Sequence, residues 1–240
     1  MHEIGAVAAV FLVEVLRKHK NENICLLLWG YIVLFFKKFC FGNMFSNTYV
    51  VWDEESREAL ICDLGNEAEP ILRFASSEGL RVKYLVLTHP HYDHVLYMEE
   101  YREAFPDANL AIGAADAPLL SDIEGNVSYL FGDSRVFGGV DSKLCDGEAL
   151  LLGESTLTVV STPGHTPGGI CLYSEADKLM ITGDTLFGGG GIGRTDFKYG
   201  SIDELRASLR RILSMNGDIT ILPGHGGASK IAYEQRSLFC

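Results

Sequence analysis

The chain has 240 residues, 47% of them hydrophobic, which excludes a disordered protein and allows one large folded domain. A formal net charge of −12 disfavours contact with the phosphate backbone of nucleic acids, so we expect no nucleic-acid partner. The six cysteines are scattered and form no CxxC pair, a pattern typical of free thiols in a reducing compartment, so we expect a cytoplasmic protein.

Residues 1–31 form a predicted N-terminal extension of uncertain role, ahead of a folded domain over residues 32–240. The apolar run at residues 24–36 is shorter than the roughly 20 residues that a membrane-spanning helix needs, so we expect no stable membrane insertion. A signal peptide is not evident, because the basic residues follow the first apolar stretch. Three interpretations stay open: a segment that associates weakly with membranes, an extra packed helix, or a region outside the working domain. The last two are favoured.

Short apolar and β-branched runs continue along the chain and predict a strand-rich domain. Strands are expected at residues 31–41, 48–52, 59–63, 82–87, 110–112, 149–152, 157–161, 170–173, 178–182 and 220–222. Helices are expected at residues 67–77, 95–105, 114–120, 201–213 and 228–235. Residues 121–139 mix glycine, polar and aromatic residues, and form either a surface connection or a flap beside a functional site.

A dense group of metal-ligand side chains directly follows the predicted strand at residues 82–87. Three histidines and one aspartate lie within six residues, in the sequence Thr88-His89-Pro90-His91-Tyr92-Asp93-His94. Along an extended segment His89, His91 and Asp93 point the same way, and His94 enters the start of the next helix. Neutral imidazoles with a carboxylate suit zinc, iron or manganese. The motif therefore predicts a metal site.

The other candidate ligands also follow predicted strands. Five of the seven histidines lie in three short motifs, and the second and third of these motifs contain His165 and His225. Asp184 follows the strand expected at residues 178–182. Since strands that pair in sheets bring their ends together, we expect these loops to converge on one preorganised metal centre.

Together, the four loops resemble the metallo-β-lactamase-fold hydrolases, in matching order over residues 40–240. Within that superfamily they look most like the single-domain hydroxyacylglutathione hydrolase (glyoxalase II)-like group, on the motifs at residues 162–168, 182–187 and 191–197. The resemblance implies an α+β fold, an αββα four-layer sandwich with two sheets between outer helices. It also implies that residues 32–240 are a catalytic domain.

The resemblance further implies two divalent metal ions, first of all zinc, with iron and manganese also compatible. Carried over residue by residue, one metal has the ligands His89, His91 and His165. The other metal has the ligands Asp93, His94 and His225. Asp184 bridges the two metals, and Asp63 matches a family position that supports the site from behind.

The chain departs from the family pattern in two places. Val95-Leu96-Tyr97 stands where the family often has a glycine soon after the first motif. We also expect the chain to lack the C-terminal helical domain through which two-domain glyoxalase II enzymes bind glutathione. Glutathione specificity is therefore not inherited from the resemblance.

The implied activity is metal-dependent hydrolysis of a small-molecule thioester, such as a hydroxyacyl-glutathione-like compound. A metal-bound hydroxide would attack the carbonyl carbon, with Asp93 both ligating a metal and orienting the hydroxide. Cys62 and Cys171 lie in predicted strands and are interpreted as core residues, so neither is expected to be a nucleophile. Arg194 is the expected substrate-binding residue, because guanidinium groups bind carboxylates through two hydrogen bonds. A salt bridge from Arg194 to Asp196 is the alternative.

Other functions stay open. A mononuclear-iron persulfide dioxygenase-like oxidoreductase shares the fold and a Gly-Arg-Thr-Asp-Phe stretch, with iron at the positions matching His89, His165 and Asp184. The complete second set of ligands favours the dinuclear hydrolase. The acidic charge disfavours a nuclease, the lack of a secretion signal disfavours a β-lactamase, and the intact ligand set disfavours a non-catalytic binding protein. The sequence does not fix the thiol, the acyl group, the resident metal or the oligomeric state.

Overall fold

The computed structural model describes residues 34–41 and 44–239. The predicted extension over residues 1–31 lies outside the described residues, as does the start of the strand expected at residues 31–41. None of the helices in the described part is long and apolar enough to cross a membrane.

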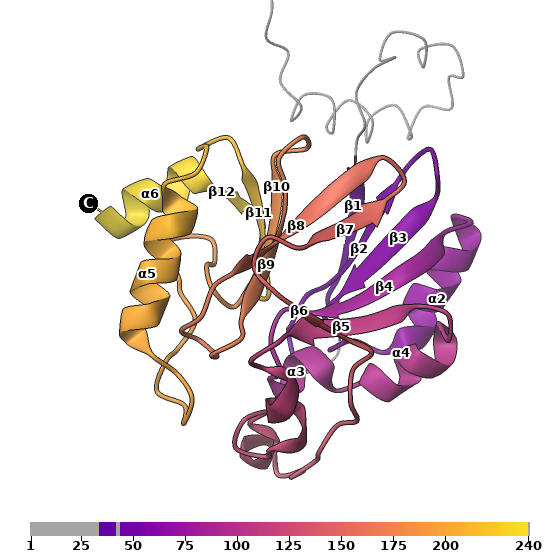
Figure 1. Cartoon of the computed structure of the whole chain (residues 1–240), viewed down its shortest axis with the longest axis horizontal. Coiled ribbons are helices and arrows are strands. Elements are labelled where there is room, and N and C mark those ends of the chain that lie inside the picture. The colour runs from indigo at the N-terminus through magenta and orange to yellow at the C-terminus, as the bar shows by residue number, and fades with distance from the viewer. Residues whose placement is uncertain (1–33, 42–43, 240) are drawn as a thin grey trace, which may run out of the picture.

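Six strands form the first sheet, in the order β1-β2-β3-β4-β5-β6 (Figure 1). Their bounds are Leu34–Phe39, Thr48–Asp53, Glu58–Cys62, Arg81–Leu87, Asn109–Gly113 and Ser142–Leu144. Strands β1, β2 and β3 pair antiparallel, whereas β3 to β6 run parallel. The sequence does not predict β6, because Ser142–Leu144 contains one apolar residue and no β-branched or apolar run.

Six more strands form the second sheet, in the order β12-β11-β10-β9-β8-β7. In chain order from β7 to β12 their bounds are Ala149–Leu152, Ser155–Ser161, Ile170–Ser174, Leu179–Gly183, Thr220–Pro223 and Ser229–Lys230. Strands β10 and β11 run parallel, and the remaining neighbours are antiparallel. Parallel pairing matters for the site, because it places the carboxyl ends of β10 and β11 next to each other.

Five helices and two 3₁₀ turns complete the described fold. The helices α2 to α6 span Ala68–Ser77, Tyr92–Val95, Met98–Ala104, Ile202–Leu213 and Ile231–Phe239. The 3₁₀ turns η2 and η3 span Ala117–Ser121 and Ser128–Phe131. The short helix expected at residues 114–120 is thus the turn η2, shifted by three residues at its start.

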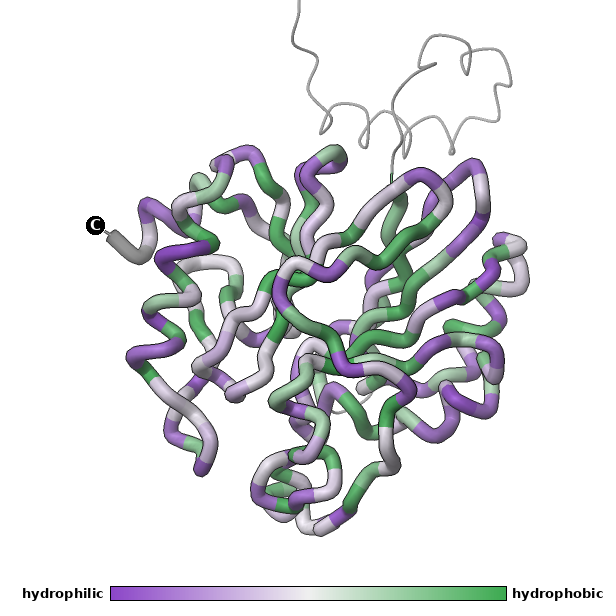
Figure 2. The backbone as a smooth tube through the Cα atoms, viewed as in Figure 1, coloured by the Kyte–Doolittle hydropathy of each residue, from purple (hydrophilic) through white to green (hydrophobic). Residues whose placement is uncertain are grey.

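The core consists of three apolar layers that follow from the alternation of the strands. On β2, Tyr49 and Val51 enter the layer between the two sheets, while Val50 and Trp52 enter the layer beneath α2 and α4. A third layer packs β10 and β11 against α5 and α6. Figure 2 shows the hydrophobic residues concentrated along the inner strands, and hydrophilic residues along α5. This arrangement is the expected αββα four-layer sandwich.

The single helix expected at residues 95–105 is two helices, α3 and α4. The first begins earlier, at Tyr92, with His91 in an extended N-cap conformation. The break occurs at Tyr97, whose backbone N–H donates to Leu64 O at 3.0 Å and so leaves the helical hydrogen-bond ladder. A contact to a residue more than thirty positions away ends the helix, and local sequence spacing does not reveal it.

Candidate metal centre

Seven side chains converge where strands of both sheets end. Strand β4 ends at Leu87 and leads directly to His89 and His91, while Asp93 and His94 lie on α3. The extended backbone of His91, with φ −63° and ψ 145°, carries the chain from the strand end into the helix. The four ligand candidates of the first motif therefore come from a loop and from a short helix.

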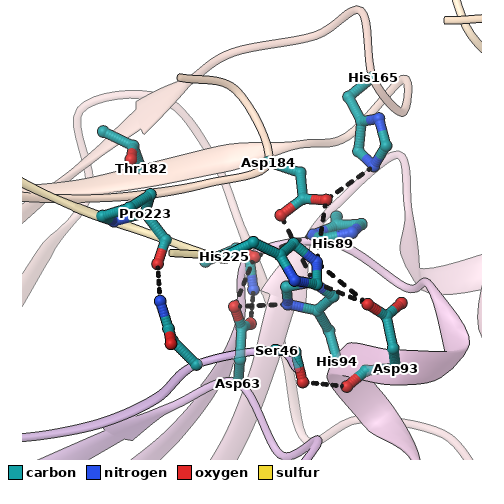
Figure 3. A network of polar contacts seen from close by, with 12 residues as sticks. Ser46, Asp63, His89, Asp93, His94, His165, Thr182, Asp184, Pro223 and His225 are labelled. Atoms are coloured by element: carbon teal, nitrogen blue, oxygen red, sulfur yellow. Dashed lines mark hydrogen bonds and ion pairs between the residues drawn. The ribbon is translucent and has the colours of Figure 1, made fainter. Parts of the chain in front are cut away.

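The other three ligand candidates come from the second sheet. His165 follows β8, Asp184 follows β10 and His225 follows β11. Since β10 and β11 are parallel neighbours, Asp184 and His225 emerge side by side. The two sheets are joined at this edge by Thr88 O, which accepts a hydrogen bond from Ile170 N at 3.0 Å. Figure 3 shows the loops of both sheets meeting around Asp184.

The ligand atoms gather into sets whose members all lie within 4.8 Å of one another. We call one set, His89 with His91 and His165, the first group. A second group contains Asp93, His94 and His225. A further set joins His89 and His94 to Asp184, so Asp184 lies between the groups. The structure thus brings together all seven predicted ligands; that they hold metals remains a prediction.

Distances within the site support a position for Asp184 between the two groups. Asp184 Oδ1 lies 3.4 Å from His94 Nε2, and Asp184 Oδ2 lies 3.7 Å from His165 Nε2. In the second group, His225 Nε2 lies 3.1 Å from Asp93 Oδ2 and 3.2 Å from His94 Nε2. Asp184 Oδ2 also lies 3.6 Å from His225 Nε2, so the carboxylate of Asp184 contacts residues of both groups (Figure 3).

Four of the five histidines use Nδ1 for a supporting hydrogen bond, which leaves Nε2 directed to the centre. The partners of His89, His94, His165 and His225 are Thr88 Oγ1, Asp63 Oδ2, Arg194 O and Phe45 O, at 3.0, 2.9, 2.7 and 3.0 Å. A ring that donates from Nδ1 carries its lone pair on Nε2, which is the form that binds a cation.

Asp63 supports both groups, as the sequence predicts for this position. Its Oδ1 accepts from Thr88 N at 2.8 Å, and its Oδ2 accepts from Thr88 Oγ1 at 2.9 Å and from His94 Nδ1. Because the Thr88 hydroxyl donates to Asp63, it is free to accept from His89 Nδ1. One buried carboxylate thereby orients an imidazole of each group.

Burial and charge set the protonation of the cluster. Burial first, and then the neighbouring imidazoles, hold the pKa of His89 and of His91 well below the ordinary histidine value. Burial also lowers the pKa of His165. The first group is therefore neutral and suited to bind a cation.

The second group contains opposite charges. Burial disfavours the charged forms of His94 and His225, but the adjacent carboxylates, Asp93 foremost, outweigh it and raise both pKa values. Burial likewise raises the pKa of Asp93, yet the two imidazoles hold it well below its ordinary value. A bound cation would replace the protons of these imidazoles as the partner of the carboxylates.

Unpartnered buried atoms test whether the residues fit a metal. His89 Nε2, His165 Nε2 and Asp184 Oδ1 are buried and have no hydrogen-bond partner among the described residues. Buried polar atoms without a partner are rare unless an ion or water satisfies them. All three belong to the predicted ligand set and face the centre, so the donor set fits divalent metal ions.

Arg194 lies beside the site, where it contacts His165, Asp196 and Phe197. Its backbone oxygen supports His165, and its guanidinium forms two hydrogen bonds of 2.6 Å to Asp196. The guanidinium also lies 4.3 Å from the ring centroid of Phe197, which in turn contacts His91. The salt bridge named above as the alternative is thus present in the structure. Substrate binding by Arg194 remains a prediction.

Residues 121–139 pack against Tyr92 of the first motif. Tyr92, between His91 and Asp93, donates its backbone N–H to Asn126 O at 2.8 Å, stacks on Phe131, and donates its hydroxyl to Asp133. The segment thus lies beside the site, as the flap interpretation requires, and its role as a flap remains a prediction.

Sequence reasoning missed Asp116, a buried residue that holds the His165 loop. Asp116 accepts hydrogen bonds of 2.6 Å from Thr166 Oγ1 and from Gly168 N, and burial raises its pKa to about 7. The available signal was its place just beyond the strand at residues 110–112, which is where the ligands of the other loops also lie.

A family model described as the metallo-beta-lactamase superfamily matches residues 41–225. The chain belongs to this superfamily. It is 35% identical over 198 residues to hydroxyacylglutathione hydrolase GloC of Haemophilus influenzae, covering 80% of this chain and 90% of that protein. It is 31% identical over 197 residues to human mitochondrial persulfide dioxygenase ETHE1, covering 80% of this chain and 69% of that protein.

Solved structures of the superfamily resemble the chain at similar levels. The BLEG-1 B3 metallo-beta-lactamase has a TM-score of 0.78 and 30% identity, over 85% of this chain and 99% of that chain. TTHA1623, solved in a di-iron-bound form, has a TM-score of 0.72 and 28% identity, over 84% of this chain and 98% of that chain. A hydrolase, a dioxygenase and a lactamase thus all appear among the relatives of this metallo-beta-lactamase fold.

Replacement of Gly224 tests the packing of the metal centre. A Cβ at Gly224 would lie 2.2 Å from Asp184 Oδ1 and 2.7 Å from His94 Cε1, so Gly224→Ala must displace Asp184, which lies between the groups, and His94 of the second group. We expect zinc affinity, measured by chelator competition, to fall by roughly 10- to 100-fold. Gly227→Ala is the matched control, because its Cβ would meet nothing within 4 Å. Equal zinc affinities in the two variants would contradict the described geometry.

Proposed function

We propose that this superfamily enzyme is a dinuclear metallo-hydrolase that cleaves a small-molecule thioester. The observation that carries the proposal is the complete second group, Asp93, His94 and His225, gathered against Asp184. The likeness to a relative named hydroxyacylglutathione hydrolase supports a hydroxyacyl-glutathione-like substrate. The free thiols among the described cysteines fit the predicted cytoplasmic location.

The first group with Asp184 would hold one divalent cation, and the second group with Asp184 would hold the other. Two bound cations supply a Lewis acid for a carbonyl oxygen and lower the pKa of water towards neutrality. We assign no resident metal; zinc, iron and manganese all fit imidazole and carboxylate ligands.

Residues of the chain supply orientation and proton handling. The carboxylate of Asp93 faces the centre from α3 and would accept a hydrogen bond from the attacking water, which fixes the direction of attack. The water oxygen forms a bond to the carbonyl carbon, the carbon–sulfur bond breaks, and the leaving thiolate takes the proton that the water loses. Cys62 and Cys171 are fully buried in strands, so neither would serve as a nucleophile.

A paired activity assay tests the proposal. We expect zinc-loaded protein to release thiol from acyl-glutathione thioesters, and iron-loaded protein with glutathione persulfide to consume no oxygen. Persulfide oxygenation is the second candidate, supported by the 31% identity to human ETHE1. Oxygen uptake without thioester cleavage would reject the hydrolase in its favour. A chromogenic cephalosporin, included because of the likeness to BLEG-1, should remain intact.

Truncation of Arg194 tests substrate binding. If its guanidinium binds a substrate carboxylate, Arg194→Ala should raise KM roughly tenfold and change kcat less, because the lost contact is a charge-assisted hydrogen bond. Arg206→Ala is the control, since Arg206 has a similar exposure and also pairs with an aspartate, Asp203, on α5. An unchanged KM in Arg194→Ala would remove Arg194 from the binding role and leave it as the partner of Asp196.

A further inference from the structure

The segment Phe45–Asn47, just before β2, touches two of the three residues in the second group. Phe45 O accepts the hydrogen bond from His225 Nδ1 at 3.0 Å, and Ser46 forms an antiparallel β-bridge with His225. Ser46 Oγ donates to Asp93 O at 2.6 Å (Figure 3). The second group is therefore attached to this segment at both Asp93 and His225.

Asn47 holds the His225 loop on both sides of the imidazole. Its side chain is fully buried, and its amide nitrogen lies 2.8 Å from Pro223 O and 3.0 Å from Gly226 O. Its backbone N–H donates to Gly224 O at 2.7 Å. Three carbonyls of one short loop are thus fixed by a single residue.

The other end of the Asn47 amide indicates which of its atoms the fold requires. Asn47 Oδ1 is buried and has no hydrogen-bond partner among the described residues. An unpartnered buried acceptor costs free energy, so Oδ1 does not explain why an asparagine stands here. The amide nitrogen does, because it donates to two carbonyls of the His225 loop. The contact is therefore directed at the position of the His225 loop.

His225 depends on these bonds more than the other ligands do. Its side chain is 32% exposed, against 0% for His94 and 6% for His165. A fully buried ring is confined by its packing on all sides, whereas a partly exposed ring is confined mainly by the backbone that carries it. Without the Asn47 side chain, the His225 loop would lose the hydrogen bonds from Asn47 to Pro223 O and Gly226 O. It would keep the bond from the backbone N–H of residue 47 to Gly224 O.

The first group is fixed by other residues. His89 is supported through Thr88 and Asp63, and the His165 loop is held by Asp116. In the described part of the chain, the hydrogen bonds of residues 45–47 reach Asp93, the loop at residues 223–226, Tyr49 and Asn66, and none reaches a side chain of the first group. The two groups can therefore be perturbed separately.

We propose that Ser46 and Asn47 are positioning residues that determine whether the second divalent cation binds. They hold Asp93 and His225 at the spacing that brings both within reach of His94. This inference rests on the proposed two-metal function and deepens it, because it names residues that set the number of metals without ligating either. Neither residue is among the seven ligand candidates.

Zinc stoichiometry of three proteins tests the inference. We compare the wild type, Asn47→Ala and Asn126→Ala after equilibration at buffered zinc concentrations, by elemental analysis and by chelator competition. Asn126 is a matched control, because it is equally buried and its amide nitrogen also binds two loop carbonyls, Leu120 O and Arg135 O, each at 2.9 Å. Thermal unfolding followed by circular dichroism reports the stability of each protein.

We expect two zinc ions per chain in the wild type and in Asn126→Ala. In Asn47→Ala the first zinc should bind as before, and the affinity for the second should fall by roughly 10- to 100-fold. We expect the affinity of Asn47→Ala for the second zinc to fall even if the two variants have equal melting temperatures. If Asn47 had only a structural role, its replacement would change stability and not the affinity for the second zinc.

Three results would overturn the inference. Unchanged binding of two zinc ions by Asn47→Ala would do so while leaving the two-metal proposal intact. Loss of the second zinc in both variants would reduce the effect to general destabilisation. A single zinc in the wild type would instead reject the two-metal proposal, and the inference with it.

A second variant decides the matter where Asn47→Ala does not fold. Ser46→Ala removes only the Oγ contact to Asp93 O and leaves the Asn47 bonds in place. Weakened binding of the second zinc by this variant supports the inference, and unchanged binding of both ions overturns it.

Discussion

The metal centre depends on one buried carboxylate, Asp63, which is placed where β3 ends and accepts three hydrogen bonds. Through Thr88 and His94 it joins the end of β4 to the helix α3, and thereby orients an imidazole of each group. Asp63 adopts a left-handed backbone conformation, with φ 61°, that turns the chain at this point. Local backbone strain of this kind persists where the surrounding contacts determine it, and it is common at functional sites.

Sequence predicts the ligands and most strands because their signals are local. The first motif holds four ligands in six residues, and an apolar or β-branched run precedes each ligand loop. The fold class follows from the order of these elements together with the family resemblance. What escapes prediction depends on distant partners: the helix break at Tyr97 needs Leu64 O, and Asn47 bonds a carbonyl 176 positions away. Single polar residues with remote partners have no periodic pattern.

The charge distribution explains why these seven side chains can be packed so closely. Their two carboxylates and five imidazoles include three buried atoms without a hydrogen-bond partner among the described residues, which is costly unless an ion or water compensates for it. The supporting hydrogen bonds to Nδ1 keep the ring nitrogens directed inward, so the site is preorganised before a cation arrives. Hydrolase and dioxygenase relatives share the superfamily fold, and the number of metals is the feature on which our proposal distinguishes the two activities.

Anomalous X-ray diffraction from crystals of the metal-loaded protein tests this account most directly. Data collected at the zinc and iron edges should give two peaks about 3.5–4 Å apart, the usual spacing of two-metal sites. One peak should lie within the first group, the other within the second group, and Asp184 should contact both. A single iron peak beside His89, His165 and Asp184, with the second group empty at saturating metal, would contradict the dinuclear centre.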